Sequence, residues 1–438
     1  MSFSKSAMGL GLRALNRFAG LPVVDRLGLR KPSEKVVFQA SRAGFRTIGA
    51  ASRSFVAVQK LLKPARLAGA RSAGLFDLTP SEEQQMLRDA ARSFADEQLR
   101  PAAPAADRAC AAPAELMRSS AELGIGLMGV PEELGGAGSE RSATTNVLVA
   151  EALAHGDLGL AFAVLAPSAV STALVLWGDE RQQAQYLPAF VGDRAPAAAL
   201  AVLEPQPLFD PFALTTRAHK AEGGYVLDGV KALVPRAAEA ELFVVAAQLE
   251  GQGPALFVVE SSTPGIGIER EPAMGLRAAA TGRVVLKEVK LPAAALLGAA
   301  QPEVYADCVQ LGRIGWSALA CGTAQAVLDY VIPYVNERVA FGEPISHRQA
   351  VAFAVANIGI ELEGMRLLTL RAASRAECGQ PFAQQAALAR RQCIDKGMWI
   401  GAEGLQLLGG HGFVKEHPVE RWYRDLRAVG VMEGGLLV

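Results

Sequence analysis

The chain has 438 residues, 50% of them hydrophobic, so it is long enough for two or three domains with large cores. Its formal net charge is zero, and no uninterrupted apolar run approaches the roughly 20 residues that a membrane span needs. Five scattered cysteines without Cys-x-x-Cys spacing indicate reduced thiols in a cytosolic-type compartment and argue against disulfides or a zinc site.

Charge is unevenly distributed along the chain. Residues 1–75 carry 14 Lys and Arg against 2 acidic residues, whereas the remainder carries 30 against 42. We predict a basic amphipathic N-terminal arm over 1–75. It could be a peripheral membrane anchor or a packed helical arm, and we rank both above an organelle transit peptide. The expected location is cytoplasmic, peripheral at a membrane surface if the arm is an anchor, or mitochondrial if it is a transit peptide.

Residues 76–198 show a helical pattern. Thr79-Pro80-Ser81-Glu82-Glu83 is a good helix start, because a proline suits the first turn and acidic residues complement the positive helix end. Pro101 and Pro104 are expected to end that helix. The glycine run after Pro131 lacks phosphate-loop spacing, so by itself it predicts a turn-rich loop.

Short β-rich runs replace the helical pattern over 199–296. Tyr225-Val226-Leu227, Leu242-Phe243-Val244-Val245 and Ala255-Leu256-Phe257-Val258-Val259 are separated by glycine, proline and charged residues. This spacing predicts a small antiparallel sheet domain, either a sandwich or a barrel.

From about residue 297 to 438 the pattern is helical again. Gly312-Arg313-Ile314-Gly315-Trp316 opens a long helix, and Arg338-Val339-Ala340-Phe341-Gly342 follows it. By itself the second run is most simply a helix end. A glycine-rich turn, Gln406-Leu407-Leu408-Gly409-Gly410-His411-Gly412-Phe413, comes later. The five histidines of the chain have no metal-ligand spacing, and no nucleic-acid patch with interleaved aromatic residues is present, so we expect neither ligand.

Near the end one carboxylate, Glu433, has apolar residues on both sides, including Val431, Met432 and Leu436. Burial raises the pKa of a carboxylate and suits it to proton abstraction. A lone glutamate is more simply a surface acid, but the ordered motifs before Glu433 favour a catalytic base.

The series from Gln406 to Gly434 resembles the C-terminal catalytic region of the acyl-CoA dehydrogenases. That family has a Gln, a Gly-Gly-x-Gly turn, a Tyr/His-Pro-Val-Glu-Arg helix start, an Arg-Asp pair and a Glu-Gly, and all occur here in order. The resemblance covers about 76–435. It implies an α+β fold with an N-terminal helical domain (76–198), a middle antiparallel β-domain (199–296) and a C-terminal helical bundle (297–438).

The resemblance also implies roles for particular residues. Glu433 would remove the α-proton of a fatty acyl-CoA thioester, with Arg313 and Gly434 as substrate-binding residues. FAD would be the cofactor, and no metal is expected. The residues implied to contact FAD, several of them across a dimer, are Arg338, Phe341, Gln349, Gln406, Gly409, Gly410 and Glu204.

Two segments depart from the family pattern. Leu203 stands where the family usually has a threonine before Glu204-Pro205, and the Gly-Ser of the following loop is absent. Pro235 stands where a hydroxyl residue usually donates a hydrogen bond near the flavin N5. Proline has neither a hydroxyl nor an N–H, so that bond, worth about 1 kcal/mol, cannot form.

The end of the chain differs as well. Gly435 replaces the usual threonine, and the relatives continue with more helix beyond the position of Val438. The C-terminal domain is therefore expected to be incomplete.

The function implied is FAD-dependent oxidation of a fatty acyl-CoA to trans-2-enoyl-CoA in β-oxidation. The Gly-Arg-x-Gly run and the N-terminal arm look more like the very-long-chain branch, which indicates a long acyl chain. An electron-transferring flavoprotein would take the electrons, and a homodimer or dimer of dimers is expected. The alternatives are an impaired relative that binds acyl-CoA or a partner, and an acyl-CoA oxidase.

Overall fold

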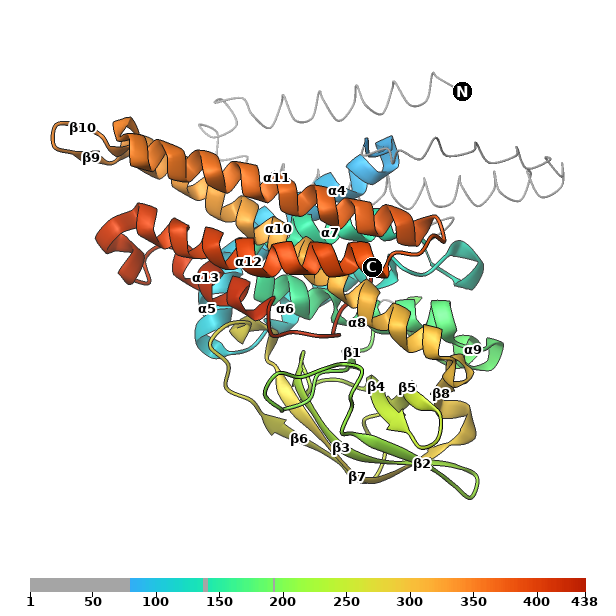
Figure 1. The fold of residues 1–438 in the computed structure, drawn as a ribbon. Coiled ribbons are helices and arrows are strands. Elements are labelled where there is room, and N and C mark those ends of the chain that lie inside the picture. The colour runs from blue at the N-terminus through green and yellow to red at the C-terminus, as the bar shows by residue number, and fades with distance from the viewer. Residues whose placement is uncertain (1–78, 137–140, 192–193) are drawn as a thin grey trace, which may run out of the picture. The chain divides into compact units, whose positions relative to one another are not determined.

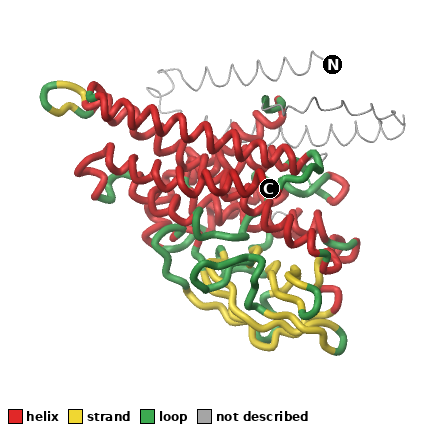
Figure 2. Tube along the Cα trace, in the orientation of Figure 1, coloured by secondary structure: helices red, strands yellow, loops and turns green. Residues whose placement is uncertain are grey.

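The computed structural model describes residues 79–136, 141–191 and 194–438. The chain divides into two compact units, 1–75 and 76–438, and the expected basic arm lies outside the described residues. The second unit combines helices with one eight-stranded sheet. In Figure 2 the helices are red and the strands are yellow. The expected α+β fold is confirmed.

Helices form the first part of the second unit (Figure 1). They are α4 (Glu82–Phe94), α5 (Arg100–Ala109), α6 (Ala114–Glu122), α7 (Ala143–Gly156), α8 (Leu158–Trp177) and α9 (Glu180–Val191). The predicted start of α4 is confirmed. The Ser81 hydroxyl accepts a bond from the Gln84 N–H at 3.1 Å, and the Gln84 side chain accepts one from the Ser81 N–H at 3.0 Å.

The prediction that Pro101 and Pro104 end this helix is wrong. A π-helical segment, η1 (Ala95–Leu99), follows α4, and α5 continues directly from it with Pro104 inside. Pro101 lies in the first turn of α5, where a missing N–H and a fixed φ do little harm. The wider π-turn before α5 makes room for the new start.

Helix α8 corrects the expectation about apolar runs. It has 20 residues with a mean hydropathy of 2.0, long and apolar enough to cross a membrane. However, 94% of its most apolar window is buried inside the fold. Polar interruptions at Ser168, Ser171 and Thr172 are small, and the Ser171 hydroxyl donates to the Ser168 carbonyl at 3.1 Å. A helix that is apolar all round is a core helix when other elements cover it, as here.

The sheet runs in the order β6-β7-β3-β2-β4-β5-β8, with β1 paired to β4. Its strands are β1 (Ala198–Ala201), β2 (Arg217–Ala221), β3 (Gly224–Val234), β4 (Leu242–Leu249), β5 (Gly253–Glu260), β6 (Ile266–Arg270), β7 (Gly282–Pro292) and β8 (Leu296–Leu297). Most pairs are antiparallel, as predicted, but β4 pairs in parallel with both β1 and β2. Strand β4 is buried along most of its length, as parallel-paired strands usually are.

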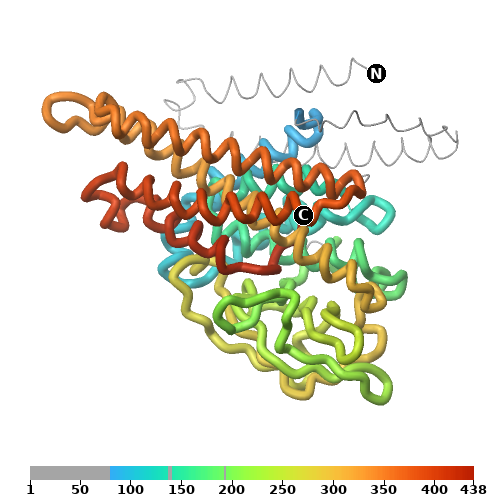
Figure 3. Tube along the Cα trace, viewed as in Figure 1, coloured from blue at the N-terminus to red at the C-terminus, as the bar shows by residue number. Residues whose placement is uncertain are grey.

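Long helices complete the unit, and in Figure 3 they form the orange-to-red end of the chain. They are α10 (Pro302–Glu337), α11 (Gln349–Glu377), α12 (Ala383–Leu408) and α13 (Val419–Ala428). A short hairpin of β9 (Val339–Ala340) and β10 (Glu343–Pro344) joins α10 to α11, and a 3₁₀ turn, η8 (Gly409–Phe413), follows α12. Helix α10 starts well before the predicted Gly312, because Pro302 already occupies its first turn. It packs against α7, α11 and α12.

Candidate active site

Glu433 lies in the segment 429–438, which follows α13 and forms neither helix nor strand. Its side chain is only 6% exposed. Arg313 on α10 donates from Nη2 to Glu433 Oε1 at 3.0 Å and from Nε to both carboxylate oxygens at 3.2 and 3.3 Å. Arg390 on α12 brings its Nη2 to 3.0 Å from Oε1. The carboxylate is buried, as its apolar neighbours indicate, but it is held by two cations.

No motif in the sequence identifies Arg390 as a site residue. Its Nη1 also donates to the Met432 carbonyl at 3.0 Å, so one guanidinium contacts both the backbone and the carboxylate of the Met432-Glu433 pair. Burial lowers the pKa of Arg390; Glu433 offsets part of this effect, and Arg313 adds to it. In the sequence, Arg390 is indistinguishable from its neighbour Arg391, which is 77% exposed and pairs with Asp395. Only the orientation of α12 separates the two.

Gly434 and Gly435 carry the chain away from Glu433 in a conformation that suits glycine, with φ of +71° and +78°. A Cβ on Gly434 would lie 2.6 Å from Val202, and one on Gly435 would lie 2.7 Å from the Phe162 ring. Trp316 donates from Nε1 to the Gly434 carbonyl at 2.8 Å. This backbone therefore excludes the threonine that the family resemblance leads one to expect at 435.

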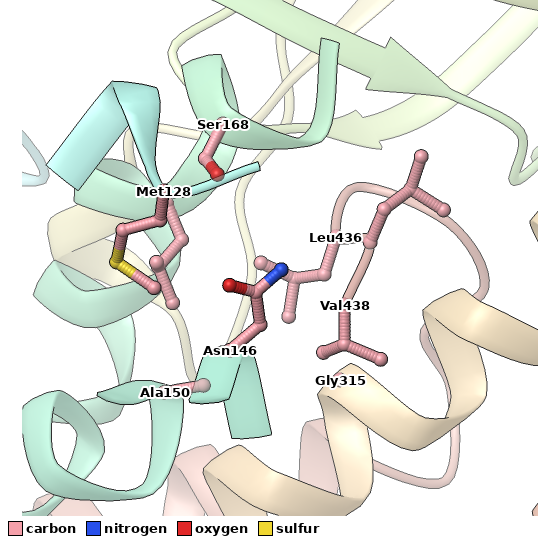
Figure 4. Close-up of a pocket in the computed structure, with 9 residues that line it drawn as sticks. Met128, Asn146, Ala150, Ser168, Gly315, Leu436 and Val438 are labelled. Carbon is pink, nitrogen blue, oxygen red and sulfur yellow. The ribbon is translucent and has the colours of Figure 1, made fainter. Parts of the chain in front are cut away.

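Residues 436–438 continue inward and are buried against α8 and α10. Their side chains line a small pocket together with Met128, Asn146, Ala150, Leu165, Ser168 and Gly315. Figure 4 shows the Asn146 amide beside Leu436 and Val438. Neither polar atom of that amide has a hydrogen-bond partner among the described residues. The three residues at the end of the sequence are thus packed inside the helical part of the fold.

The residues implied to contact FAD gather at one end of the helical bundle. Arg338, Phe341 and Gln349 lie around the β9–β10 hairpin, while Gln406, Gly409 and Gly410 lie at the end of α12 and in η8. Tyr334 joins the two groups, because its hydroxyl lies 3.0 Å from both the Leu408 carbonyl and His411 Nδ1.

All six side chains or glycines at this end are exposed, Phe341 to 95%. The side chains of Arg338, Gln349 and Gln406 make no hydrogen bond or ion pair with any residue in the described ranges, and none of the six contacts Glu433. They form a surface whose donors are open to a ligand. Gly409, at φ +59° and ψ −132°, needs to be glycine.

Glu204 is buried and occupied inside the β-domain. It accepts bonds from the Thr215 N–H and hydroxyl, from the Thr216 N–H, and from Lys231 Nζ at 2.8 Å. Burial favours the neutral acid, but Lys231 and Thr215 outweigh it and lower the pKa of Glu204 to about 2. Burial lowers the pKa of Lys231 to about 8, against the opposing effect of Glu204. This ion pair holds the loop 203–216 in place.

The segment that departs from the family pattern near Pro235 has its hydrogen-bond donors engaged. The Ala232 N–H donates to the Leu203 carbonyl at 2.8 Å, and the Leu233 N–H donates to the Glu271 carboxylate at 2.6 Å. Leu233 has a φ of +49°. Pro235 has no N–H, and its ring lies 3.9 Å from a Cβ built on Gly435. This segment does not supply the N5 donor that the family pattern implies.

Comparisons with known proteins agree with this architecture along the chain. Family models described as the N-terminal, middle and C-terminal domains of acyl-CoA dehydrogenase match residues 81–193, 199–289 and 303–435. A mitochondrial short-chain specific acyl-CoA dehydrogenase of Bos taurus is 34% identical over 364 residues, covering 81% of this chain and 87% of the relative.

Solved structures give the same result. The butyryl-CoA dehydrogenase of Megasphaera elsdenii has a TM-score of 0.76 and 29% identity, covering 82% of this chain and 96% of its own. A chain in a structure titled for the electron transferring flavoprotein of Acidaminococcus fermentans has a TM-score of 0.76 and 28% identity, with the same coverage. The fold and the family models define an oxidoreductase of the flavoprotein class. The chain belongs to the acyl-CoA dehydrogenase family, whose members are FAD-dependent oxidoreductases.

Proposed function

We propose that this protein oxidises an acyl-CoA thioester to the trans-2-enoyl-CoA, with Glu433 as the base that removes the α-proton. The observation that carries this proposal is the placement of Glu433, which is buried and held between α10 and α12 in a segment without regular structure. A carboxylate held in a dry site is suited to proton abstraction once substrate covers it. Family membership supplies the reaction class.

The two carboxylate oxygens of Glu433 are not equivalent. Oε1 has three contacts within 3.2 Å, from Arg313 Nε, Arg313 Nη2 and Arg390 Nη2. Oε2 has one contact, to Arg313 Nε at 3.3 Å, among the residues described. Oε2 is therefore the oxygen that takes the proton, while Oε1 anchors the side chain. The backbone N–H of Glu433 is a candidate hydrogen-bond donor to the thioester carbonyl.

FAD is the cofactor. Arg338 would bind its pyrophosphate, because a planar guanidinium with several donors suits phosphate oxygens. Gln349 and Gln406 would add amide groups, and Gly409 and Gly410 would allow close backbone approach. Their exposed, uncommitted donors fit this role. When bound, FAD supplies the two-electron oxidation at the acyl β-carbon.

For Glu204 and Phe341 the supporting observations differ. Glu204 is fully engaged with Lys231, Thr215 and Thr216, so we propose that it shapes the flavin-side loop 203–216 without contacting the cofactor itself. Phe341 is exposed at the tip of the bundle, where its ring would cover a cofactor bound mainly by a second copy.

A short acyl chain is the better proposal for the substrate. Residues 436–438, which follow Glu433 closely in the chain, are buried, and the pocket that they line has room for little more than one water molecule. The bovine relative is named for short-chain substrates. The long chain indicated by the sequence stays a prediction, which turnover of a C4-to-C16 acyl-CoA series decides.

An electron-transferring flavoprotein is the proposed electron acceptor, in keeping with the structural neighbour titled for such a protein. A second copy of the chain is the other proposed partner. The name of the bovine relative includes the word mitochondrial, whereas the location of this protein stays a prediction.

Glu433→Gln tests the catalytic assignment. The amide keeps the shape but cannot take a proton, so we expect the variant to bind FAD and to lose turnover of butyryl-CoA by roughly 10²–10⁴-fold. Bleaching of bound flavin by butyryl-CoA measures the chemical step. Glu416→Gln, at an exposed position, serves as the matched control and should keep full activity. Full turnover in Glu433→Gln would refute the assignment.

One observation favours a second candidate function, that of an impaired relative which binds acyl-CoA without oxidising it. The 232–235 segment has no free donor for the flavin, since Leu233 is bonded to Glu271 and Pro235 has none. A purified protein that takes up no FAD but binds butyryl-CoA in calorimetry would favour this candidate. Peroxide formation without an added acceptor would instead indicate an oxidase.

A further inference from the structure

The contacts of Arg390 extend beyond the carboxylate that it neutralises. Its side chain is 12% exposed, and its two terminal nitrogens contact different groups. Nη2 lies 3.0 Å from Glu433 Oε1, while Nη1 donates to the Met432 carbonyl at 3.0 Å. A guanidinium presents donors in a rigid fork, so these two contacts fix the carboxylate relative to its own backbone.

The segment that carries Glu433 depends on such contacts. Its last backbone hydrogen bonds to α13 run from the Val431 and Met432 N–H groups to the Ala428 carbonyl. Beyond Met432, within the described residues, the backbone is anchored by side chains, with Arg390 on the Met432 carbonyl, Trp316 on the Gly434 carbonyl and Arg141 on the Val438 carbonyl. Of these, the contacts nearest to Glu433 come from α10 and α12.

We propose that Arg390 is a positioning residue, which holds Glu433 Oε1 and the Met432 backbone so that Oε2 meets the substrate α-carbon in one fixed geometry. The proposal rests on the proposed role of Glu433 as the base. Among the described residues, the Arg313 side chain contacts both carboxylate oxygens of Glu433 and no backbone carbonyl of the segment, whereas Arg390 contacts one oxygen and the Met432 carbonyl. Loss of Arg390 therefore frees the backbone beside Glu433 as well as one carboxylate contact, while loss of Arg313 removes carboxylate contacts alone.

The two arginines share one carboxylate. Burial lowers the pKa of Arg390; Glu433 opposes this effect, and the nearby Arg313 adds to it. If Arg390 is removed, Arg313 still pairs with Glu433 at 3.0 Å, so the buried carboxylate keeps a cationic partner.

Arg390→Met and Arg390→Lys test this inference in the full-length protein reconstituted with FAD. For Arg390→Met we expect kcat with butyryl-CoA to fall by about 10²-fold at little change in KM, because misplacing a reacting group by about 1 Å costs that much. Arg390→Lys keeps the charge but cannot span both groups, so we expect a fall of about tenfold.

Arg391→Met is the matched control, since it removes an exposed arginine from the same helix turn and should leave kcat unchanged. Values of kcat within about twofold of wild type in both Arg390 variants would overturn the inference, provided that Glu433→Gln is inactive. A fall in kcat that is fully accounted for by lost folded protein would also overturn it. If Glu433→Gln is itself active, the proposed function fails instead. Should Arg390→Met not fold, Arg390→Lys decides alone: a tenfold loss supports the inference and wild-type kcat overturns it.

Discussion

Buried carboxylates in this chain share dry surroundings but meet different partners. Glu204 accepts bonds from Lys231 and the 215–216 backbone, and its pKa is lowered to about 2. Asp425 accepts one backbone bond, from the Leu276 N–H at 2.7 Å, and it faces Asp157. Burial and then Asp157 raise the pKa of Asp425 to about 8. The partner decides whether a buried acid stays charged.

Asp425→Asn is expected to change how stability depends on pH. The folded chain holds a proton at Asp425 that the unfolded chain releases above its ordinary value near 3.8. The stabilising contribution is therefore complete below pH 4 and is lost as pH rises to about 8, at no more than about 1.4 kcal/mol per pH unit. Asparagine keeps the acceptor for Leu276, so the pH dependence should flatten and stability at pH 8 should not fall.

Urea unfolding of wild type and variant at pH 5, 6, 7 and 8 measures this difference. Asp395→Asn, which alters a surface pair with Arg391, provides the control and should leave the pH dependence unchanged. An Asp425→Asn protein with the wild-type pH dependence would contradict the prediction.

At this scale the sequence already contains part of the site. The apolar residues around Glu433 predict that the carboxylate is buried, and Met432 and Leu436 are buried with it, although Val431 is exposed. Arg390 could not be predicted, since it comes from a different helix and follows no motif. The family resemblance names Arg313 as a substrate-binding residue, and its contact with Glu433 comes from the structure.

Among the elements, local chemistry predicted the start of α4, but not its continuation into α5 or the start of α10. Ser81 and Gln84 form a capping box that depends on four consecutive residues, so the start of α4 was readable. Pro104 predicts a helix end, but a π-helical segment before α5 allows the helix to continue past it. Whether such a segment forms depends on how α5 packs against its surroundings, and a local sequence pattern does not contain that information.

Gly435→Ala tests the connection between Glu433 and the buried residues that follow. A Cβ at this position would lie 2.7 Å from the Phe162 ring, at a φ of +78°. Strain at a positive φ and displacement of a core ring should cost about 1–3 kcal/mol or more of unfolding free energy. Because Glu433 lies two residues away, kcat should also fall.

Thermal unfolding and butyryl-CoA turnover measure these two effects. Gly359→Ala in α11 is the control, since a Cβ there meets only Leu328 at 3.9 Å and alanine favours helix. Unchanged stability of Gly435→Ala would show that the segment does not keep this conformation.

On the scale of the molecule, α11 exposes an apolar row. Phe353, Ile360 and Leu367 stand seven residues apart on one face and are 57%, 68% and 46% exposed. A row of this kind on a helix marks a contact surface. We expect a second copy of the chain to cover this row. The exposed residues proposed to bind FAD across a dimer lie at the end of the same helical bundle, which agrees with this expectation.

Ile360→Glu is expected to weaken that association. A charge in the middle of an apolar interface loses its hydration, so the assembly should dissociate at concentrations where wild type stays associated. Light scattering coupled to size-exclusion chromatography measures the mass of each. Glu363→Gln, an exposed neighbour on α11, should leave the mass unchanged. A wild-type protein that runs as a monomer at all concentrations would contradict the expected dimer.

Helix α8 has a consequence for synthesis of the protein on the ribosome. Its apolar surface is covered by α7, α9, β1, α10 and α13, and the last two are translated long after residue 177. A nascent chain in which α8 has just left the ribosome therefore exposes part of this apolar helix until α10 and α13 are synthesised. During that interval the chain is a natural client for chaperones that recognise apolar segments, and stalled translation before α10 should yield insoluble protein.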